Sequence, residues 1–208
     1  EENNYLIILD SSGNSYSADK VISTIPPNLL VNSVVFEPKL PENFTQLAKT
    51  THTWMGESIK FAVEYKTPFW KQNHYSGTIF SQASIIQEMY DHSTATNCGF
   101  ALKGFLNVGT AVLSKEDRKE KAIAQLTAFF GLEATDYVAY YENVWREEPL
   151  TFQPYEQLVL AHQNNGHSLF KNPLLNEKLY VSGAETATQS PGYMNGAIFA
   201  AKTLASQF

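Results

Sequence analysis

Apolar and polar residues alternate most clearly between positions 58 and 66. Every second residue there is apolar or aromatic, and a period of two places those side chains on one face of a β-strand. The opposite face includes Lys60, which an ordinary surface strand would leave in solvent. The pattern therefore predicts a half-buried strand whose inner face consists of Ile59, Phe61, Val63 and Tyr65.

Further runs rich in β-branched and aromatic residues predict strands at 77–81, 85–90, 99–107 and 137–144. A polar turn at 91–97 separates two of these strands. Short strands that follow one another in this way favour an antiparallel sheet. We expect the core of this sheet to contain the aromatic rings of Phe80, Tyr90, Phe100 and Phe105.

Residues 114–130 have the periodicity of an amphipathic helix. Ser114 can cap its N-terminus with Asp117 as the acid three positions later, and Gly131 is placed to end it. We expect the charged face of this helix to be solvated. Its apolar stripe consists of Ala122, Ile123, Leu126, Phe129 and Phe130.

The N-terminal part of the chain predicts less regular structure. Short apolar runs at 5–9 and 20–23 flank a turn at 10–14, and this arrangement is typical of a hairpin. The two prolines of 25–27 are expected to stop regular structure, because proline lacks a backbone N–H and restricts the residue before it. Residues 41–51 then have the composition of a short helix.

The last thirty residues combine a strand, an acid and a helix of unusual composition. An apolar run at 179–181 predicts a buried strand, and Gly183 and Glu185 follow it. From about residue 192 the pattern is helical, with small residues at helical spacing. A helix N-terminus offers unpaired N–H groups and partial positive charge, so this arrangement suits a cofactor. The small residues are Gly196, Ala197, Ala200, Ala201 and Ala205.

Composition narrows the class of protein. The chain has 208 residues, 43% of them hydrophobic, which is enough for an ordered core. A formal charge of −6 argues against nucleic acid as a partner, and no run of residues has the length of a membrane span. A single cysteine, Cys98, excludes an internal disulfide framework, and we expect a cytoplasmic protein.

Hydrolytic and metal-dependent mechanisms have little support. No pair among the five histidines has the spacing of a zinc protease, and no cluster of cysteines or acids completes a metal site, so we expect no metal. Neither a Gly-x-Ser-x-Gly elbow nor a phosphate-binding loop is present in the sequence.

Several strings have a close counterpart in one family. Ser-Gly-Ala-Glu-Thr-Ala-Thr at 182–188, followed by Pro-Gly-Tyr-Met-Asn-Gly-Ala at 191–197, closely resembles the C-terminal flavin-binding motif of the flavin-containing monoamine oxidases. Ala-Asp-Lys-Val-Ile-Ser-Thr-Ile-Pro-Pro at 18–27 and the residues around Lys60 at 55–70 are similar to other parts of these enzymes. The resemblance covers nearly the whole chain.

The resemblance implies catalytic roles for Lys60, Tyr155 and Tyr193. Tyr155 and Tyr193 match the two walls of the family's aromatic cage, which would admit an amine and align its C–H bond beside the flavin. Lys60 matches the lysine that holds a water near the flavin N5.

The resemblance also implies that Gly183, Glu185, Tyr193 and Met194 bind the cofactor FAD. Gly183 and Glu185 match positions that contact its ribityl and phosphate portion. Met194 opens the last helix and would direct a backbone N–H at the flavin pyrimidine, where the helix N-terminus stabilises negative charge.

The fold implied by the resemblance is α+β. A mixed, mostly antiparallel sheet with one long helix would form the substrate-binding domain at 28–156, and the segments 1–27 and 157–208 would belong to the FAD-binding domain. The Gly-x-Gly-x-x-Gly fingerprint that holds the cofactor pyrophosphate in the family occurs nowhere in this sequence. We therefore expect the C-terminal half of such an enzyme, inactive by itself, with FAD bound only in the full-length protein.

The implied reaction is oxidation of a small-molecule amine to an imine, with molecular oxygen as the second substrate and hydrogen peroxide as a product. Two alternatives stay open. One is a non-catalytic domain of the same fold that binds a ligand or a partner, and the other is a flavin oxidoreductase of the same superfamily that acts on a non-amine substrate. Apolar surface left exposed on such a chain would favour a homodimer.

Covalent attachment of the flavin is not expected. Family members that attach it use a cysteine directly before the cage tyrosine, and this position is Pro154 here. Acid precipitation of the full-length holoprotein should therefore release all of its flavin into the supernatant. A flavin that stays attached to the denatured chain would overturn this prediction.

Overall fold

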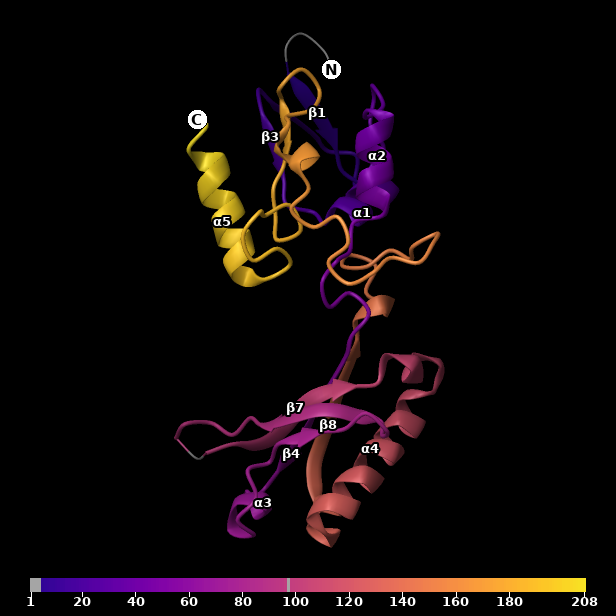
Figure 1. The fold of residues 1–208 in the computed structure, drawn as a ribbon, viewed down its shortest axis with the longest axis vertical. Coiled ribbons are helices and arrows are strands. Elements are labelled where there is room, and N and C mark those ends of the chain that lie inside the picture. Colours follow the sequence, from indigo (N-terminus) through magenta and orange to yellow (C-terminus); the bar gives the residue numbers. More distant parts are fainter. Residues whose placement is uncertain (1–4, 97) are drawn as a thin grey trace. The chain divides into compact units, whose positions relative to one another are not determined.

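The computed structural model describes residues 5–96 and 98–208. These residues form two compact units, each with its own hydrophobic core (Figure 1). The central unit is Glu57–Glu148, and the terminal unit comprises the described residues of Glu1–Gly56 and Pro149–Phe208. The α+β class and the antiparallel sheet that the sequence predicts are confirmed.

The central unit is built on a five-stranded antiparallel sheet in the order β5-β6-β7-β4-β8. β4 lies between two partners, and its residues alternate strictly between fully and partly buried, as the period of two predicts. The alternation fixes which face of β4 meets the core. The strands are β4 (Ile59–Tyr65), β5 (Ile79–Phe80), β6 (Ile86–Asp91), β7 (Phe100–Leu106) and β8 (Tyr137–Val144).

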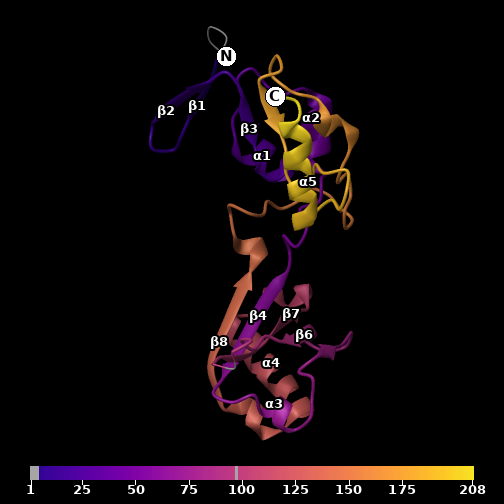
Figure 2. The same ribbon diagram turned by 90° about the vertical axis from the view of Figure 1, so that its left-hand side faces the viewer.

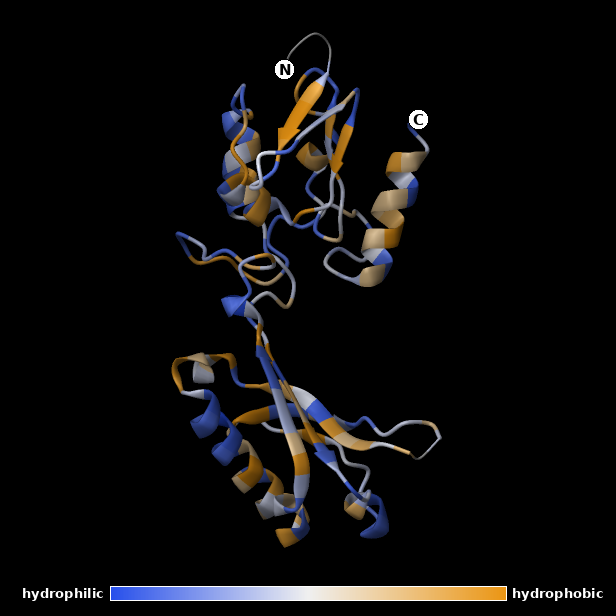
Figure 3. Cartoon of the chain, turned by 180° about the vertical axis from the view of Figure 1, so that it is seen from behind, coloured by the Kyte–Doolittle hydropathy of each residue, from blue (hydrophilic) through white to orange (hydrophobic). Residues whose placement is uncertain are grey.

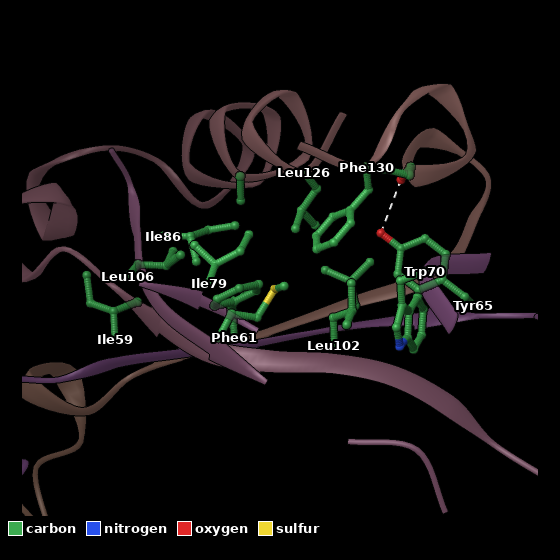
Figure 4. Packing of buried hydrophobic residues seen from close by; sticks show 14 of the residues in the cluster. Ile59, Phe61, Tyr65, Trp70, Ile79, Ile86, Leu102, Leu106, Leu126 and Phe130 are labelled. Atoms are coloured by element: carbon green, nitrogen blue, oxygen red, sulfur yellow. Dashed lines mark hydrogen bonds between the residues drawn. The ribbon is translucent and has the colours of Figure 1, made fainter. Parts of the chain in front are cut away.

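α4 (Lys115–Phe130) begins hydrophilic and ends hydrophobic (Figure 3), and its apolar side chains complete the core of the sheet. Ser114 caps it as predicted, since its Oγ accepts the backbone N–H of Asp117. Figure 4 shows Leu126 and Phe130 over the sheet residues, with the Tyr65 hydroxyl donating to the Ala134 carbonyl. The shorter helices are α3 (Phe69–Gln72) and the 3₁₀ turns η1 (Val108–Val112), η2 (Leu132–Thr135) and η3 (Trp145–Glu147).

The charged face of α4 is not wholly solvated. Arg118 is buried, and its Nη2 lies 2.7 Å from Oε1 of the buried Glu142 on β8. The guanidinium also donates to carbonyls of η1 and to Leu113, so it ties helix, strand and turn together. The expectation of a fully solvated face is therefore wrong at this position, because a paired and hydrogen-bonded charge can be buried.

Among the described residues, the terminal unit contains two small sheets and three α-helices, and the two helices nearer the N-terminus, but not the last helix, contribute side chains to its core. The N-terminal segment forms an antiparallel hairpin (Figure 2), and a parallel pair of strands joins segments from the two ends of the chain. The elements are β1 (Leu6–Leu9), β2 (Ser15–Ala18), β3 (Val21–Ser23), β9 (Leu179–Val181), α1 (Pro27–Ser33), α2 (Glu42–Lys49), α5 (Met194–Ala205) and the turn η4 (Ser168–Lys171).

Two predictions for the N-terminal part are wrong. β1, hydrophobic throughout in Figure 3, pairs with β2 rather than with 20–23, which as β3 lies parallel to β9. The buried β9 supplies a better partner for β3 than the mostly exposed β1. The prolines do not stop regular structure either, because Pro27 occupies the first position of α1, where no N–H is needed.

Three aromatic rings expected in the core are exposed. Phe80 and Phe129 are 70% and 51% exposed, and Tyr90 lies on the outer side of β6. Phe80 and Tyr90 instead pack edge to face with ring centroids 5.7 Å apart. Phe100 and Phe105 are half-buried, and the turn predicted at 91–97 ends on Asn97, which lies outside the described residues.

Candidate active site

Tyr155 and Tyr193, the two tyrosines predicted for one site, both belong to the terminal unit. Tyr155 lies in the irregular segment that begins after η3, and Tyr193 is the residue before the first turn of α5. The rings are joined through three further aromatic side chains, His52, Trp54 and His162. The structure thus brings the two predicted residues into one aromatic cluster.

His52 is the neighbour of Tyr155. Their rings are stacked, with centroids 6.4 Å apart and 22° between the planes. The next residue, Thr53, donates its backbone N–H to the Tyr155 hydroxyl over 2.8 Å. Phe152 packs edge to face on the other part of Tyr155, at 5.7 Å. Ring contacts and one hydrogen bond therefore fix the orientation of a side chain that no helix or strand carries.

Trp54 and His162 are the neighbours of Tyr193. The indole stacks on His162 with centroids 4.3 Å apart, and His162 in turn stacks on Tyr193 at 5.8 Å. Trp54 also contacts Tyr193 directly, at 5.5 Å and a tilt of 43°. The Nδ1 of His52 accepts the backbone N–H of His162 over 3.2 Å, which joins the two halves of the cluster.

Gly192 allows this packing at the turn before α5. Its φ of +82° is unfavourable for residues with a side chain, and a Cβ there would lie 3.0 Å from the Cβ of Trp54. The backbone of the turn can therefore approach the indole closely, and the family-like string Pro-Gly-Tyr gains a structural reason for its glycine.

Sequence reasoning missed His52, Trp54 and His162. A usable signal was present, because His52 and Trp54 lie in a short irregular segment directly before the family-like string that begins at Met55.

A second feature of the terminal unit is a groove along α5 with a volume of about 600 Å³. Gly183 and Glu185 line one side, and small residues of the α5 stripe line the other. Within the helix, Gly196 is buried against the turn before it, since a Cβ there would clash with the Ser190 carbonyl. The further lining residues include Thr24, Ser182, Ala197, Ala201 and Ala205.

Glu185 is the buried charge of this groove. It is 8% exposed, and burial raises the pKa of its carboxyl above the usual range for glutamate. A carboxylate in such a place can accept hydrogen bonds from hydroxyl groups, and an approaching hydroxylated ligand would relieve part of the desolvation. The residues of the groove therefore fit the ribityl chain of a flavin cofactor.

Tyr193 and Met194 mark the N-terminus of α5. Tyr193 is 49% and Met194 86% exposed, and no side chain caps the helix. The first N–H groups of α5 thus keep their partial positive charge for an outside acceptor. The Met194 side chain itself points to solvent, so only its backbone can serve the predicted cofactor contact.

Lys60 belongs to the central unit. It lies on the outer face of β4, opposite Phe105 of β7 and Asn143 of β8. Its Nζ is 5.4 Å from the centre of the Phe105 ring, a cation–π contact. The lysine is therefore half-buried against neighbouring strands rather than fully solvated.

Among residues 5–96 and 98–208, no group of three or more His, Cys, Asp or Glu side chains is placed to hold a metal ion. The helices of the same residues are also too short or too polar to cross a membrane.

This chain is similar to one known protein family and to individual proteins of known name. The model of the family "Flavin containing amine oxidoreductase" matches residues 2–207. The flavin-containing amine oxidase B of Homo sapiens is 32% identical over 204 residues, which is 92% of this chain and 38% of that protein. The putrescine oxidase of Kocuria rosea is 33% identical over 138 residues, which is 64% of this chain and 28% of that protein.

The fold has solved counterparts as well. A structure of wild-type putrescine oxidase bound to putrescine superposes with a TM-score of 0.82 at 27% identity, over 98% of this chain and 45% of that one. The chain therefore spans less than half the length of the relatives it matches.

The raised pKa of Glu185 gives a stability prediction. A carboxyl whose folded pKa is raised favours the folded state at low pH, and that contribution is lost as the pH rises through the folded pKa. Replacing Glu185 by Gln should therefore raise the melting temperature at pH 7, with the gain shrinking toward pH 4.5. Glu177 is exposed, so Glu177→Gln is the matched control and should leave the melting temperature unchanged at both pH 7 and pH 4.5. A Glu185→Gln protein that is less stable at pH 7 would contradict the desolvation account.

Proposed function

Because this chain belongs to the flavin-containing amine oxidoreductase family, we propose that its aromatic cluster is the substrate wall of a flavin site that oxidises an amine to an imine. The observation that carries the proposal is the joining of Tyr155 and Tyr193 in one cluster of stacked rings. When bound, FAD supplies a two-electron acceptor for the hydrogen on the amine α-carbon, which oxygen regenerates with release of hydrogen peroxide.

The two tyrosines bind and orient the amine. Their π faces suit a nitrogen centre that gains positive charge, and their flat rings restrict the approach of the substrate C–H bond. Tyr193 keeps half of its surface exposed, so a ligand can reach it. The hydroxyl of Tyr155 accepts a hydrogen bond from the Thr53 N–H, and this bond restricts the orientation of the tyrosine ring.

The α5 groove is proposed to hold the cofactor without a covalent bond. Glu185 would accept hydrogen bonds from the ribityl hydroxyls, Gly183 would allow close approach of the backbone, and the Met194 N–H would face the flavin pyrimidine. The absence of Gly-x-Gly-x-x-Gly from the 208 residues supports weak FAD binding and no turnover by this chain alone.

Lys60 is proposed to hold a water close to the cofactor. Its half-buried position against Phe105 limits the orientations of the ammonium group, which suits a residue that must place one water molecule. We further propose that residues 28–156 bind substrate and that 1–27 and 157–208 complete the FAD-binding domain. A cytoplasmic location and a homodimer stay predictions.

Peroxide release by the full-length holoprotein with a panel of amines tests the proposal. Tyr193→Ala and Lys60→Met should each lower kcat/KM by about 10²-fold, the size expected when a positioning or proton-handling group is lost. Lys66→Met, the same change just beyond the end of β4, is the matched control and should keep the parent rate.

The same assay separates the alternatives. If amines give no more peroxide than other substrates do, or if only alcohols and acids give peroxide, a flavin oxidoreductase with a non-amine substrate would be favoured. If the protein binds FAD but none of the tested substrates reduces the bound flavin, a non-catalytic binding domain would be favoured.

A further inference from the structure

The segment from His52 to Trp54 contacts both predicted cage residues. His52 stacks on Tyr155, Thr53 donates its N–H to the Tyr155 hydroxyl, and Trp54 contacts Tyr193. Tyr155 lies about 100 residues and Tyr193 about 140 residues after this segment in the chain.

The segment is itself held firmly on its outer side. The His52 N–H donates to the Gln163 carbonyl over 3.0 Å, and the His52 carbonyl accepts the Asn165 side chain over 2.8 Å. His52 Nδ1 accepts the His162 N–H, which fixes the ring in the tautomer that leaves Nδ1 without a proton. Backbone and ring are thus bound to the same loop, 162–165.

Both tyrosines depend on contacts of this kind. No helix or strand of the described chain includes residues 149–159, so Tyr155 is oriented by its side-chain partners. Tyr193 precedes α5 as its N-cap residue but makes no side-chain capping bond, so its ring is oriented by Trp54 and His162. A ring without such support would sample several rotamers.

We propose that His52 and Trp54 are positioning residues that hold Tyr155 and Tyr193 in one fixed arrangement. This inference rests on the proposed function of the two tyrosines. Because one short segment supports both walls, the spacing of the cage is set by residues 52–54, and a disturbance at either ring is transmitted to the other.

The test uses four variants of the full-length holoprotein. His52→Ala and Trp54→Ala remove a ring, whereas His52→Phe keeps a stacking surface and removes both ring nitrogens, the Nδ1 acceptor included. His92→Ala changes an exposed histidine of the central unit and is the control. Hydrogen–deuterium exchange of peptides covering 150–157 and 190–196 is measured together with kcat and KM.

The expected result is faster exchange in both peptides for His52→Ala and Trp54→Ala. For these variants kcat should fall about 10-fold or more while KM changes less, since misaligned walls affect the chemical step more than binding. His52→Phe should retain most of the protection and most of the rate. His92→Ala should match the parent in every measurement.

Exchange that increases in only one of the two peptides, or uniformly over the whole terminal unit, would overturn the inference. An unchanged kcat in a variant with loosened peptides would overturn it as well. Exchange is measured without turnover, so failure of the proposed amine oxidation leaves the first readout intact and the two failures are distinguishable. If His52→Ala does not fold, Trp54→Ala compared with Trp54→Phe supplies the same test, because the first removes the ring and the second keeps an aromatic surface.

Discussion

The hydrogen bond from the Thr53 N–H to the Tyr155 hydroxyl, with the stacked His52 ring beside it, is the contact on which the candidate site depends most. It directs a side chain that lies on an irregular segment, where the backbone alone cannot set its orientation. Through Trp54 and His162 the same cluster reaches Tyr193 at the start of α5. The candidate cage therefore has one common support.

The fold explains why this support is available at that point of the chain. Segment 52–56 precedes β4, and Gly56 is the last residue of the terminal unit before Glu57 begins the central one. A Cβ at Gly56 would lie 2.9 Å from the Phe152 ring, so this backbone passes close to the Tyr155 segment. Lys60 follows only four residues after Gly56 in the sequence.

Periodic segments could be predicted from the sequence, whereas the packing of irregular ones could not. β4 and α4 were recognisable because alternation and helical spacing report burial directly. Phe80 was misplaced because an edge strand of two residues turns only Ile79 inward, and no local pattern reveals where a sheet ends. Tyr90 was misplaced because it follows the buried Met89 on β6 and so lies on the outer face of that strand. The pairing of β3 with β9 joins segments more than 150 residues apart, beyond the range of any hairpin signal.

The predicted site residues show the same division. Tyr193, Gly183 and Glu185 lie in a nearly gap-free string, so resemblance alone could select them. His162 could not be selected, because a lone histidine in a loop has no pattern and its role arises only from what it stacks against. His52 and Trp54 had only their position before the family-like string to mark them. The burial of Glu185, which raises its pKa, is likewise a property of the folded groove.

The most direct test of the account is anaerobic mixing of the full-length holoprotein with a primary amine while the visible absorbance of the flavin is followed. The account predicts that the flavin band disappears on addition of the amine and returns when oxygen is admitted. A flavin that chemical reductants bleach but that no amine bleaches would contradict the assignment of Tyr155 and Tyr193 as the walls of an amine-oxidising site.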